Sequence, residues 1–254
     1  MRPKGVSDAI VSHVLLVEAP EGLVLIDAGY GLLDIADPDA RIGPGRHFLN
    51  PDLVESECAI RQVEALGFSP KDVREIVLTH FDTDHAGGVS DFAWARVRVH
   101  ALEAQALREP VSEMERTRYA TAQWGRALEL VEFQTPKQED EFLGFDSYDR
   151  VKVCGAEIVV IATPGHTRGH CALALEGERG WVLHAGDAFY HHAQLWGEGE
   201  IPVTIRGLEK TVAVDRAQVK ANHERFATLH QEQGAALTIV NSHDPILFAQ
   251  AKAR

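Results

Sequence analysis

One ten-residue run constrains this chain more than any other part of its sequence. The run Thr79–Gly88 follows the apolar segment Ile76–Leu78, ends in two glycines, and holds four side chains that can bind a metal ion: His80, Asp82, Asp84 and His85. This order predicts a buried strand that ends in a loop carrying the ligands. Imidazole and carboxylate groups together favour zinc, manganese or iron(II) over calcium, which prefers oxygen ligands alone.

The same pattern recurs further along the chain. A β-type run ends, and a metal-capable residue follows within a few positions, at His166, Asp187 and His243. If the strands belong to one shared sheet and end at the same edge, these three residues lie close to His80. His80 and Asp82 are two positions apart and can point the same way along an extended segment, whereas Asp84 and His85 turn toward a neighbouring position. We therefore expect two adjacent metal sites.

The remaining sequence alternates strand and helix patterns. Strands are expected at 11–17, 22–26, 75–79, around Val97 and Val99, and at 157–162, 172–175, 181–184 and 237–240. Helices are expected at 50–67, at 101–130 with a break at Pro110, and at 215–233. Residues 34–50 have the composition of a loop, and 134–149 match no element. Since no linker or repeat divides the chain, one domain spanning residues 1–254 is expected.

Charge and composition limit the expected partners. The chain carries a formal charge of −13, which argues against nucleic acid and anionic membranes. No run of about eighteen apolar residues could span a membrane, and no apolar core of signal-peptide type follows the first charged residues. Three widely spaced cysteines, Cys58, Cys154 and Cys171, are typical of small core residues in a reduced cytoplasm.

Five segments, in this order, resemble the metallo-β-lactamase superfamily: Asp27–Gly29, His80–His85, Thr163–Thr167, Gly186–Asp187 and Ser242–His243. The resemblance spans nearly the whole chain. It implies an αββα four-layer sandwich, an α/β fold of the α+β type, with a dinuclear metal site at the sheet edge.

The resemblance also implies a role for each candidate ligand. His80, Asp82 and His166 would hold the first metal, Asp84, His85 and His243 would hold the second, and Asp187 would bridge them. Two divalent ions are expected, with zinc favoured and manganese or iron as alternatives. A metal-bound hydroxide would attack an ester, lactone, thioester or amide carbonyl, and Asp84 would orient it.

One position departs from the family motif His-x-His-x-Asp-His, because Asp82 replaces the middle histidine. Aspartate can ligate zinc, or Asp82 can support a ligand without touching the metal. As a ligand it adds a negative charge, so that three aspartates would balance two divalent cations and one hydroxide. We therefore predict a site that acidifies its bound water less and tolerates manganese or iron better.

Two short stretches suggest the substrate class. Asp187–Tyr190 resembles the Asp-Ala-x-Tyr stretch of lactonases in this superfamily, including those acting on acyl-homoserine lactones, and Ser242–Asp244 is similar to the same subgroup. The resemblance implies that the Tyr190 hydroxyl is an oxyanion donor; packing beside the neighbouring hairpin is the alternative. The expected function is a metal-dependent hydrolase that opens a lactone or a related ester of a small molecule.

Three other functions stay open. They are a thioester hydrolase of the glyoxalase II type, a mononuclear-iron sulfur dioxygenase, and a non-catalytic protein that binds a metal or ligand. A homodimer is also an expected form, since dimers are common among similar proteins.

Several polar residues beside these motifs have a structural interpretation. We expect Asp27 to fix a turn or to hydrogen-bond a ligand, and 191–192 to lie on an exposed loop. A basic and aromatic stretch on an expected helix contains Arg116, Arg118, Tyr119 and Trp124. A solvated helix face is the first interpretation of that stretch, and a clamp for a substrate carboxylate is the second.

Overall fold

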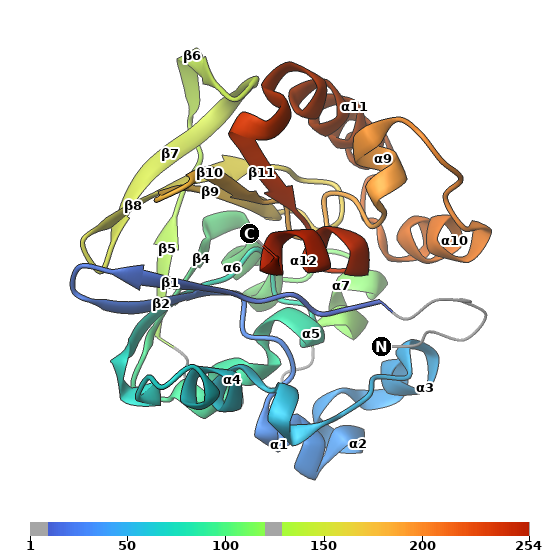
Figure 1. Ribbon diagram of the computed structural model, residues 1–254. Coiled ribbons are helices and arrows are strands. Elements are labelled where there is room, and N and C mark those ends of the chain that lie inside the picture. The colour runs from blue at the N-terminus through green and yellow to red at the C-terminus, as the bar shows by residue number, and fades with distance from the viewer. Residues whose placement is uncertain (1–9, 120–128, 254) are drawn as a thin grey trace.

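Two β-sheets form the centre of the molecule (Figure 1). The computed structural model describes residues 10–119 and 129–253. The first sheet has the order β1-β2-β3-β4-β5, with the strands Leu15–Ala19, Gly22–Ile26, Val73–Val77, Arg96–His100 and Leu130–Phe133. The second sheet has the order β11-β10-β9-β8-β7-β6. Its strands, from β6 to β11, are Lys137–Phe142, Phe145–Val153, Ala156–Ala162, Cys171–Gly177, Gly180–His184 and Leu237–Val240.

The two sheets pack against each other because their strands are apolar on both faces. In β2, Val24 and Ile26 join an apolar cluster with Ile158 and Leu173 of the second sheet. Alternate side chains of a strand point to opposite faces. Leu23 and Leu25 accordingly belong to a different cluster, on the outer face of the first sheet.

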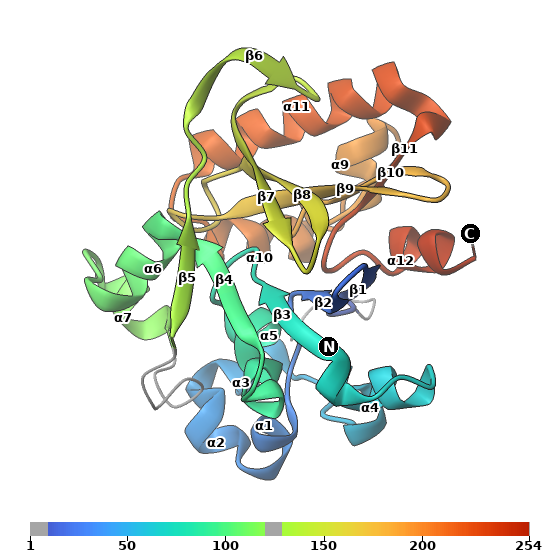
Figure 2. The same cartoon turned by 90° about the vertical axis from the view of Figure 1, so that its left-hand side faces the viewer.

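Helices cover both outer faces. The outer face of the first sheet packs against α4 (Ala59–Ala65) and α6 (Ala101–Arg108) through Val63 and Ala104. The outer face of the second sheet packs against α11 (Arg216–Gln233) through Phe226, with α9 (His192–Trp196) and α12 (Pro245–Lys252) beside it. Figure 2 shows α11 and α4 on opposite sides of the paired sheets. The predicted αββα sandwich is confirmed.

Strand direction determines where the strand ends meet. In the first sheet β2, β3 and β4 run parallel. In the second sheet β10 is parallel to β11, and β8 and β10 each pair antiparallel with β9, so β8, β10 and β11 run the same way. His80 follows β3, whereas His166, Asp187 and His243 follow β8, β10 and β11. The expectation of one shared sheet is therefore wrong, because the four points come from both sheets.

Some predicted elements differ from the structure. Residues 34–50 are not a loop: Leu32–Ala36 (α1), Pro38–Arg41 (α2) and Arg46–Leu49 (α3) are helices too short to show a periodic pattern. The helix predicted from residue 50 begins only at Ala59. The unassigned 134–149 region is largely the hairpin β6–β7.

The long helix predicted at 101–130 is also corrected. It divides near Pro110, as expected, into α6 and the short α7 (Glu113–Arg118), but β5 already begins at Leu130. Its remaining part, 120–128 with Trp124, lies outside the described residues.

The three cysteines are free and buried, as predicted. Within 10–119 and 129–253, no helix combines the length and the apolar character needed to cross a bilayer.

Candidate metal centre

Seven side chains from the ends of both sheets converge in one cluster, which we call the ligand cluster. They form three overlapping groups whose ligand atoms lie within 4.8 Å of one another: a first group of His80, Asp82 and His166, a second group of Asp84, His85 and His243, and a group of His80, His85 and Asp187 that connects the two. These are the seven residues that the sequence indicated as metal ligands. All except Asp82 are buried.

The first group is built around one carboxylate oxygen of Asp82. Asp82 Oδ2 lies 3.0 Å from His166 Nε2 and 3.5 Å from His80 Nε2. Asp82 precedes the single-turn helix α5 (Thr83–Ala86), which turns the next two candidate ligands away from it.

The second group lies on the other side of that turn. Asp84 Oδ2 is 3.8 Å from His85 Nε2 and 3.7 Å from His243 Nε2. Asp84 and His85 are consecutive residues of α5, so their side chains leave the backbone in different directions. The residue spacing therefore produces two neighbouring groups, as the sequence suggested.

Asp187 lies between the two groups. Its Oδ2 is 3.5 Å from His166 Nε2 and 3.0 Å from His243 Nε2, and its Oδ1 is 3.3 Å from His85 Nε2. His80 Nε2 is 4.0 Å from the same carboxylate. One carboxylate thus reaches histidines of both groups, which is the arrangement a bridging ligand needs.

Hydrogen bonds at Nδ1 turn three of the histidine rings so that Nε2 faces the cluster. The Nδ1 atom of His243 lies 2.9 Å from the carbonyl oxygen of Val11, and that of His85 lies 2.9 Å from Asp27 Oδ2. The Nδ1 atom of His80 is 3.0 Å from the hydroxyl of Thr79. A histidine that donates from one ring nitrogen presents the lone pair of the other to a metal.

Asp27 connects these supports without entering the cluster. It follows β2 in the left-handed region, with φ 58°. Its carboxylate accepts hydrogen bonds from both the N–H and the hydroxyl of Thr79 and contacts His85. Gly88 allows the segment after α5 to lie against the backbone that follows Asp27, because a Cβ at Gly88 would overlap the carbonyl oxygen of Ala28.

The chemistry of the cluster fits divalent metal ions. His80 Nε2, His85 Nε2 and Asp187 Oδ1 are buried and have no hydrogen-bond partner among the described residues. Leaving a buried polar atom unpaired costs about 1–3 kcal/mol, a cost that a bound cation removes. Burial opposes ionisation of Asp187, but the nearby His243 and His85 keep the pKa of its carboxyl well below the ordinary value. Ionised carboxylates and imidazole nitrogens form a suitable donor set for zinc.

Arg118 pairs with Asp82, and this corrects the interpretation of its helix. Arg118 Nε lies 3.1 Å from Asp82 Oδ1, and the Arg118 side chain is only 7% exposed. Tyr119 is buried as well. The first interpretation, a solvated helix face, is wrong for these two residues, because α7 ends against the ligand cluster rather than in solvent.

Glu103 is a supporting residue that the sequence did not indicate. Its fully buried carboxylate accepts from the backbone N–H groups of Phe81 and Gly169 and from the hydroxyls of Tyr119 and Thr167. It therefore ties the loop after β3 to the loop after β8. A glutamate in α6 has no local signal for this role, because all four donors are distant in sequence.

Tyr190 reaches the cluster with its hydroxyl. The hydroxyl donates to Asp187 Oδ2 at 2.6 Å and lies 3.5 Å from His166 Nδ1. The ring stacks on His243 with a centroid distance of 4.9 Å. Burial, together with the charge of Asp187, raises the pKa of Tyr190 well above its ordinary value, so its hydroxyl stays protonated.

The prediction for residues 191–192 is wrong, and another histidine, His170, supports the cluster. His191 and His192 are half-buried rather than exposed, because His192 Nδ1 pairs with Asp244 Oδ2 at 2.8 Å and packs on Trp196. His170 stays outside the ligand cluster and accepts a hydrogen bond from the N–H of Asp187.

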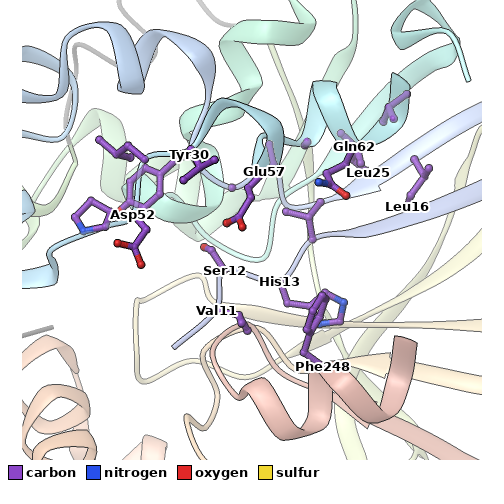
Figure 3. Close-up of a pocket in the computed structure, with 18 of the residues that line it drawn as sticks. Val11, Ser12, His13, Leu16, Leu25, Tyr30, Asp52, Glu57, Gln62 and Phe248 are labelled. Atoms are coloured by element: carbon purple, nitrogen blue, oxygen red, sulfur yellow. The ribbon is translucent and has the colours of Figure 1, made fainter. Parts of the chain in front are cut away.

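A cavity of about 630 Å³ adjoins the cluster (Figure 3). Apolar side chains such as Leu16, Leu25 and Phe248 line it, and the figure shows Ser12 at its wall. The Ser12 hydroxyl donates to the carbonyl oxygen of Asp84. Ser12 thus lines this cavity and also holds the backbone of one candidate ligand in place.

Known proteins are similar to this chain over nearly its whole length. The family model of the metallo-beta-lactamase superfamily matches residues 8–243. The probable metallo-hydrolase Rv2300c of Mycobacterium tuberculosis is 44% identical over 244 residues, which cover 96% of this chain and 78% of that protein. The N-acyl homoserine lactonase AttM of Rhizobium radiobacter is 28% identical over 242 residues, or 93% of this chain and 83% of the lactonase.

Solved structures show the same fold. An N-acyl homoserine lactone hydrolase with the product N-hexanoyl-L-homoserine bound at its catalytic metal centre superposes with a TM-score of 0.64 at 19% identity, covering 100% of this chain and 89% of that one. AidC, a dizinc quorum-quenching lactonase, gives a TM-score of 0.61 at 16% identity, covering 93% and 73%.

Proposed function

Because the chain belongs to the metallo-β-lactamase superfamily and is 44% identical to a probable metallo-hydrolase, we propose that it is a metallo-hydrolase whose substrate is a lactone or a related ester. The observation that carries this proposal is the position of the Tyr190 hydroxyl, 2.6 Å from the carboxylate between the two ligand groups. Two relatives named as lactonases support it, one by sequence and one by fold.

The ligand groups would hold two divalent ions. His80, Asp82 and His166 would bind one, Asp84, His85 and His243 would bind the other, and Asp187 would reach both. Zinc is favoured, with manganese or iron as alternatives. When bound, these ions lower the pKa of water and polarise a carbonyl oxygen.

Two side chains would act on the reacting groups. The protonated Tyr190 hydroxyl would turn its single proton from Asp187 Oδ2 to the ester carbonyl oxygen as negative charge develops there, which is the role of an oxyanion donor. Asp84 Oδ2 would accept a hydrogen bond from the attacking water and orient it. Ser12 and α5 fix the backbone of Asp84, so this orientation does not depend on a mobile loop.

The remaining expectations belong to the same proposal and rest on the sequence. They are a small-molecule substrate, no nucleic-acid or membrane partner, a cytoplasmic location, and a homodimer as one form. The acidic composition supports the expected absence of nucleic-acid and anionic-membrane partners, because polyanions would be repelled.

The test combines metal analysis with a panel of lactones and thioesters. We expect close to two zinc or manganese ions per chain and lactone turnover that is lost in Asp187→Ala. The control is Asp146→Ala, which removes a surface carboxylate paired with Lys137 and should change neither quantity. One iron per chain with oxygen consumption on a persulfide would replace the proposal by a dioxygenase. Faster turnover of thioesters than of lactones would refute the substrate class.

A further inference from the structure

Arg118 reaches the ligand cluster from outside the five segments that resemble the superfamily. It is the last residue of α7, and its guanidinium has three partners on three different segments. Nε faces Asp82 Oδ1 at 3.1 Å, Nη1 donates to the carbonyl oxygen of His166 at 2.7 Å, and Nη2 donates to the carbonyl oxygen of Val212. The guanidinium thus joins the loops after β3 and β8 to the end of α10 (Val203–Val212).

A buried guanidinium needs such partners. Removing a charge from water is costly unless opposite charge and hydrogen bonds replace the lost hydration. Arginine offers a rigid planar fork of donors, and here the guanidinium forms an ion pair with one carboxylate and donates to two carbonyl oxygens. The side chain is therefore fixed by the same segments that carry Asp82 and His166.

Asp82 uses its two oxygens differently. Oδ1 faces Arg118, whereas Oδ2 faces His166 Nε2 and His80 Nε2. The ion pair orients the carboxylate so that one oxygen points into the first ligand group. It also balances the charge of Asp82, so that the two neighbouring aspartates, Asp84 and Asp187, supply the net negative charge of the cluster.

We propose that Arg118 is a positioning residue for the metal centre, and that Asp82 and Arg118 act together as one ligand of zero net charge. The pair takes the place of the neutral imidazole that the motif would otherwise hold at position 82. This inference rests on the metal centre of the proposed function and assigns it a residue that contacts neither ion. The effect of replacing Asp82 or Arg118 on metal affinity should therefore depend on whether the other residue has also been replaced.

Arg118→Gln tests the positioning role through cobalt(II) binding. Titration followed by visible absorption, with a competing chelator, gives the affinity and the coordination spectrum of each ion independently of activity. We expect one of the two affinities to fall roughly 10- to 100-fold with a changed spectrum, as for other residues that support ligands, while the second ion binds nearly as before. Arg116→Gln is the matched control, because Arg116 lies on the same helix but pairs with exposed Glu113.

The pairing of charges is tested by exchanging both partners. Asp82→His alone leaves the buried Arg118 without its carboxylate beside a cation, and we expect it to bind the first ion more weakly than the native protein. Asp82→His combined with Arg118→Gln removes that charge, and the double variant should bind more tightly than Asp82→His. Such a reversal is a coupling between the two positions that independent effects cannot produce.

The outcomes separate this inference from the proposed function. A native protein that binds no metal overturns both. Two ions in the native protein, with an unchanged cobalt titration in Arg118→Gln or with additive effects in the double variant, overturns the role of Arg118 alone. If Arg118→Gln fails to fold by circular dichroism, Arg118→Lys provides the same comparison. Lysine keeps the charge but lacks the fork, so it should retain part of the lost affinity.

Discussion

Replacing Tyr190 with phenylalanine tests the proposed chemistry at a single atom. The substitution removes the hydroxyl that donates to Asp187 Oδ2 at 2.6 Å and leaves the ring that stacks on His243. The ring and its neighbours are buried, so the change creates little space and no new charge. Any effect therefore reports the hydroxyl.

Two magnitudes follow from this geometry, and they concern different quantities. A hydrogen bond to a charged acceptor contributes about 1.5–3 kcal/mol to stability, so the free energy of unfolding of the metal-free protein should fall by that amount. If the hydroxyl donates to the developing oxyanion, kcat should fall about 10²- to 10³-fold, the usual cost of losing one such donor. KM should change little, because the donor acts in the transition state.

The assay is steady-state hydrolysis of a lactone by protein whose metal content has been measured, together with urea unfolding of the metal-free protein. Tyr148→Phe is the matched control, because the Tyr148 hydroxyl also donates to a carboxylate, Asp140 Oδ1 at 2.9 Å, on the β6–β7 hairpin. It should cost stability without affecting kcat. A Tyr190→Phe protein that loses stability but keeps native kcat at native metal content would refute the oxyanion role and leave packing as the function of this residue.

Three further predictions concern stability. In Glu103→Gln, the amide nitrogen cannot accept hydrogen bonds from the donors that contact the carboxylate, so at least one donor is left unpaired. The free energy of unfolding in urea should fall by about 1–3 kcal/mol. An unchanged free energy of unfolding would contradict the role of this carboxylate. Burial and the charge of His184 lower the pKa of His13 to about 3, so the unfolded chain binds one more proton between about pH 6.5 and pH 3. The free energy of unfolding should fall by about 1.4 kcal/mol per pH unit from this residue as the pH drops through that range, and His13→Gln should show a shallower slope than the native protein. Removing the metals with a chelator should lower the melting temperature, since an ion at 100 times its Kd contributes about 2.7 kcal/mol, and melting that is insensitive to the chelator would contradict metal binding by the folded state.

The ligand cluster was predictable because its members follow strands that are themselves easy to recognise. Short β-branched runs indicate where a strand ends, and parallel strands place their ends at one edge. The same reasoning placed His80 and His166 in one sheet, which is wrong, since the sequence pattern of a strand does not say which sheet it joins. The short helices of 32–49 were missed because a single turn has no period to detect.

Residues that support the ligands from a distance left no such signal. Glu103 looks like an ordinary helix residue, and Arg118 belongs to a stretch that the sequence first indicated as a solvated helix face. The supporting role of each is identified only by the donors and acceptors that the fold brings to it. A buried charge in a helix is unusual in itself, but burial is a property of the packed structure and not of the local sequence. Pattern reasoning therefore finds the atoms that would contact a metal more readily than those that hold them.

This difference changes the conclusion about Asp82. From the motif alone, the aspartate adds a negative charge, and the predicted result is a less acidifying site with a broader choice of metals. The positive charge of Arg118, whose Nε lies 3.1 Å from Asp82 Oδ1, balances the negative charge of Asp82. The first ligand group then has the net charge that a neutral histidine at position 82 would give, and the reason for that prediction no longer holds. An aspartate in place of the motif histidine is thus compatible with the same metal chemistry only when Arg118, at the end of α7, accompanies it. The variant Asp82→His, which restores the family motif, should for this reason impair the first ligand group rather than improve it.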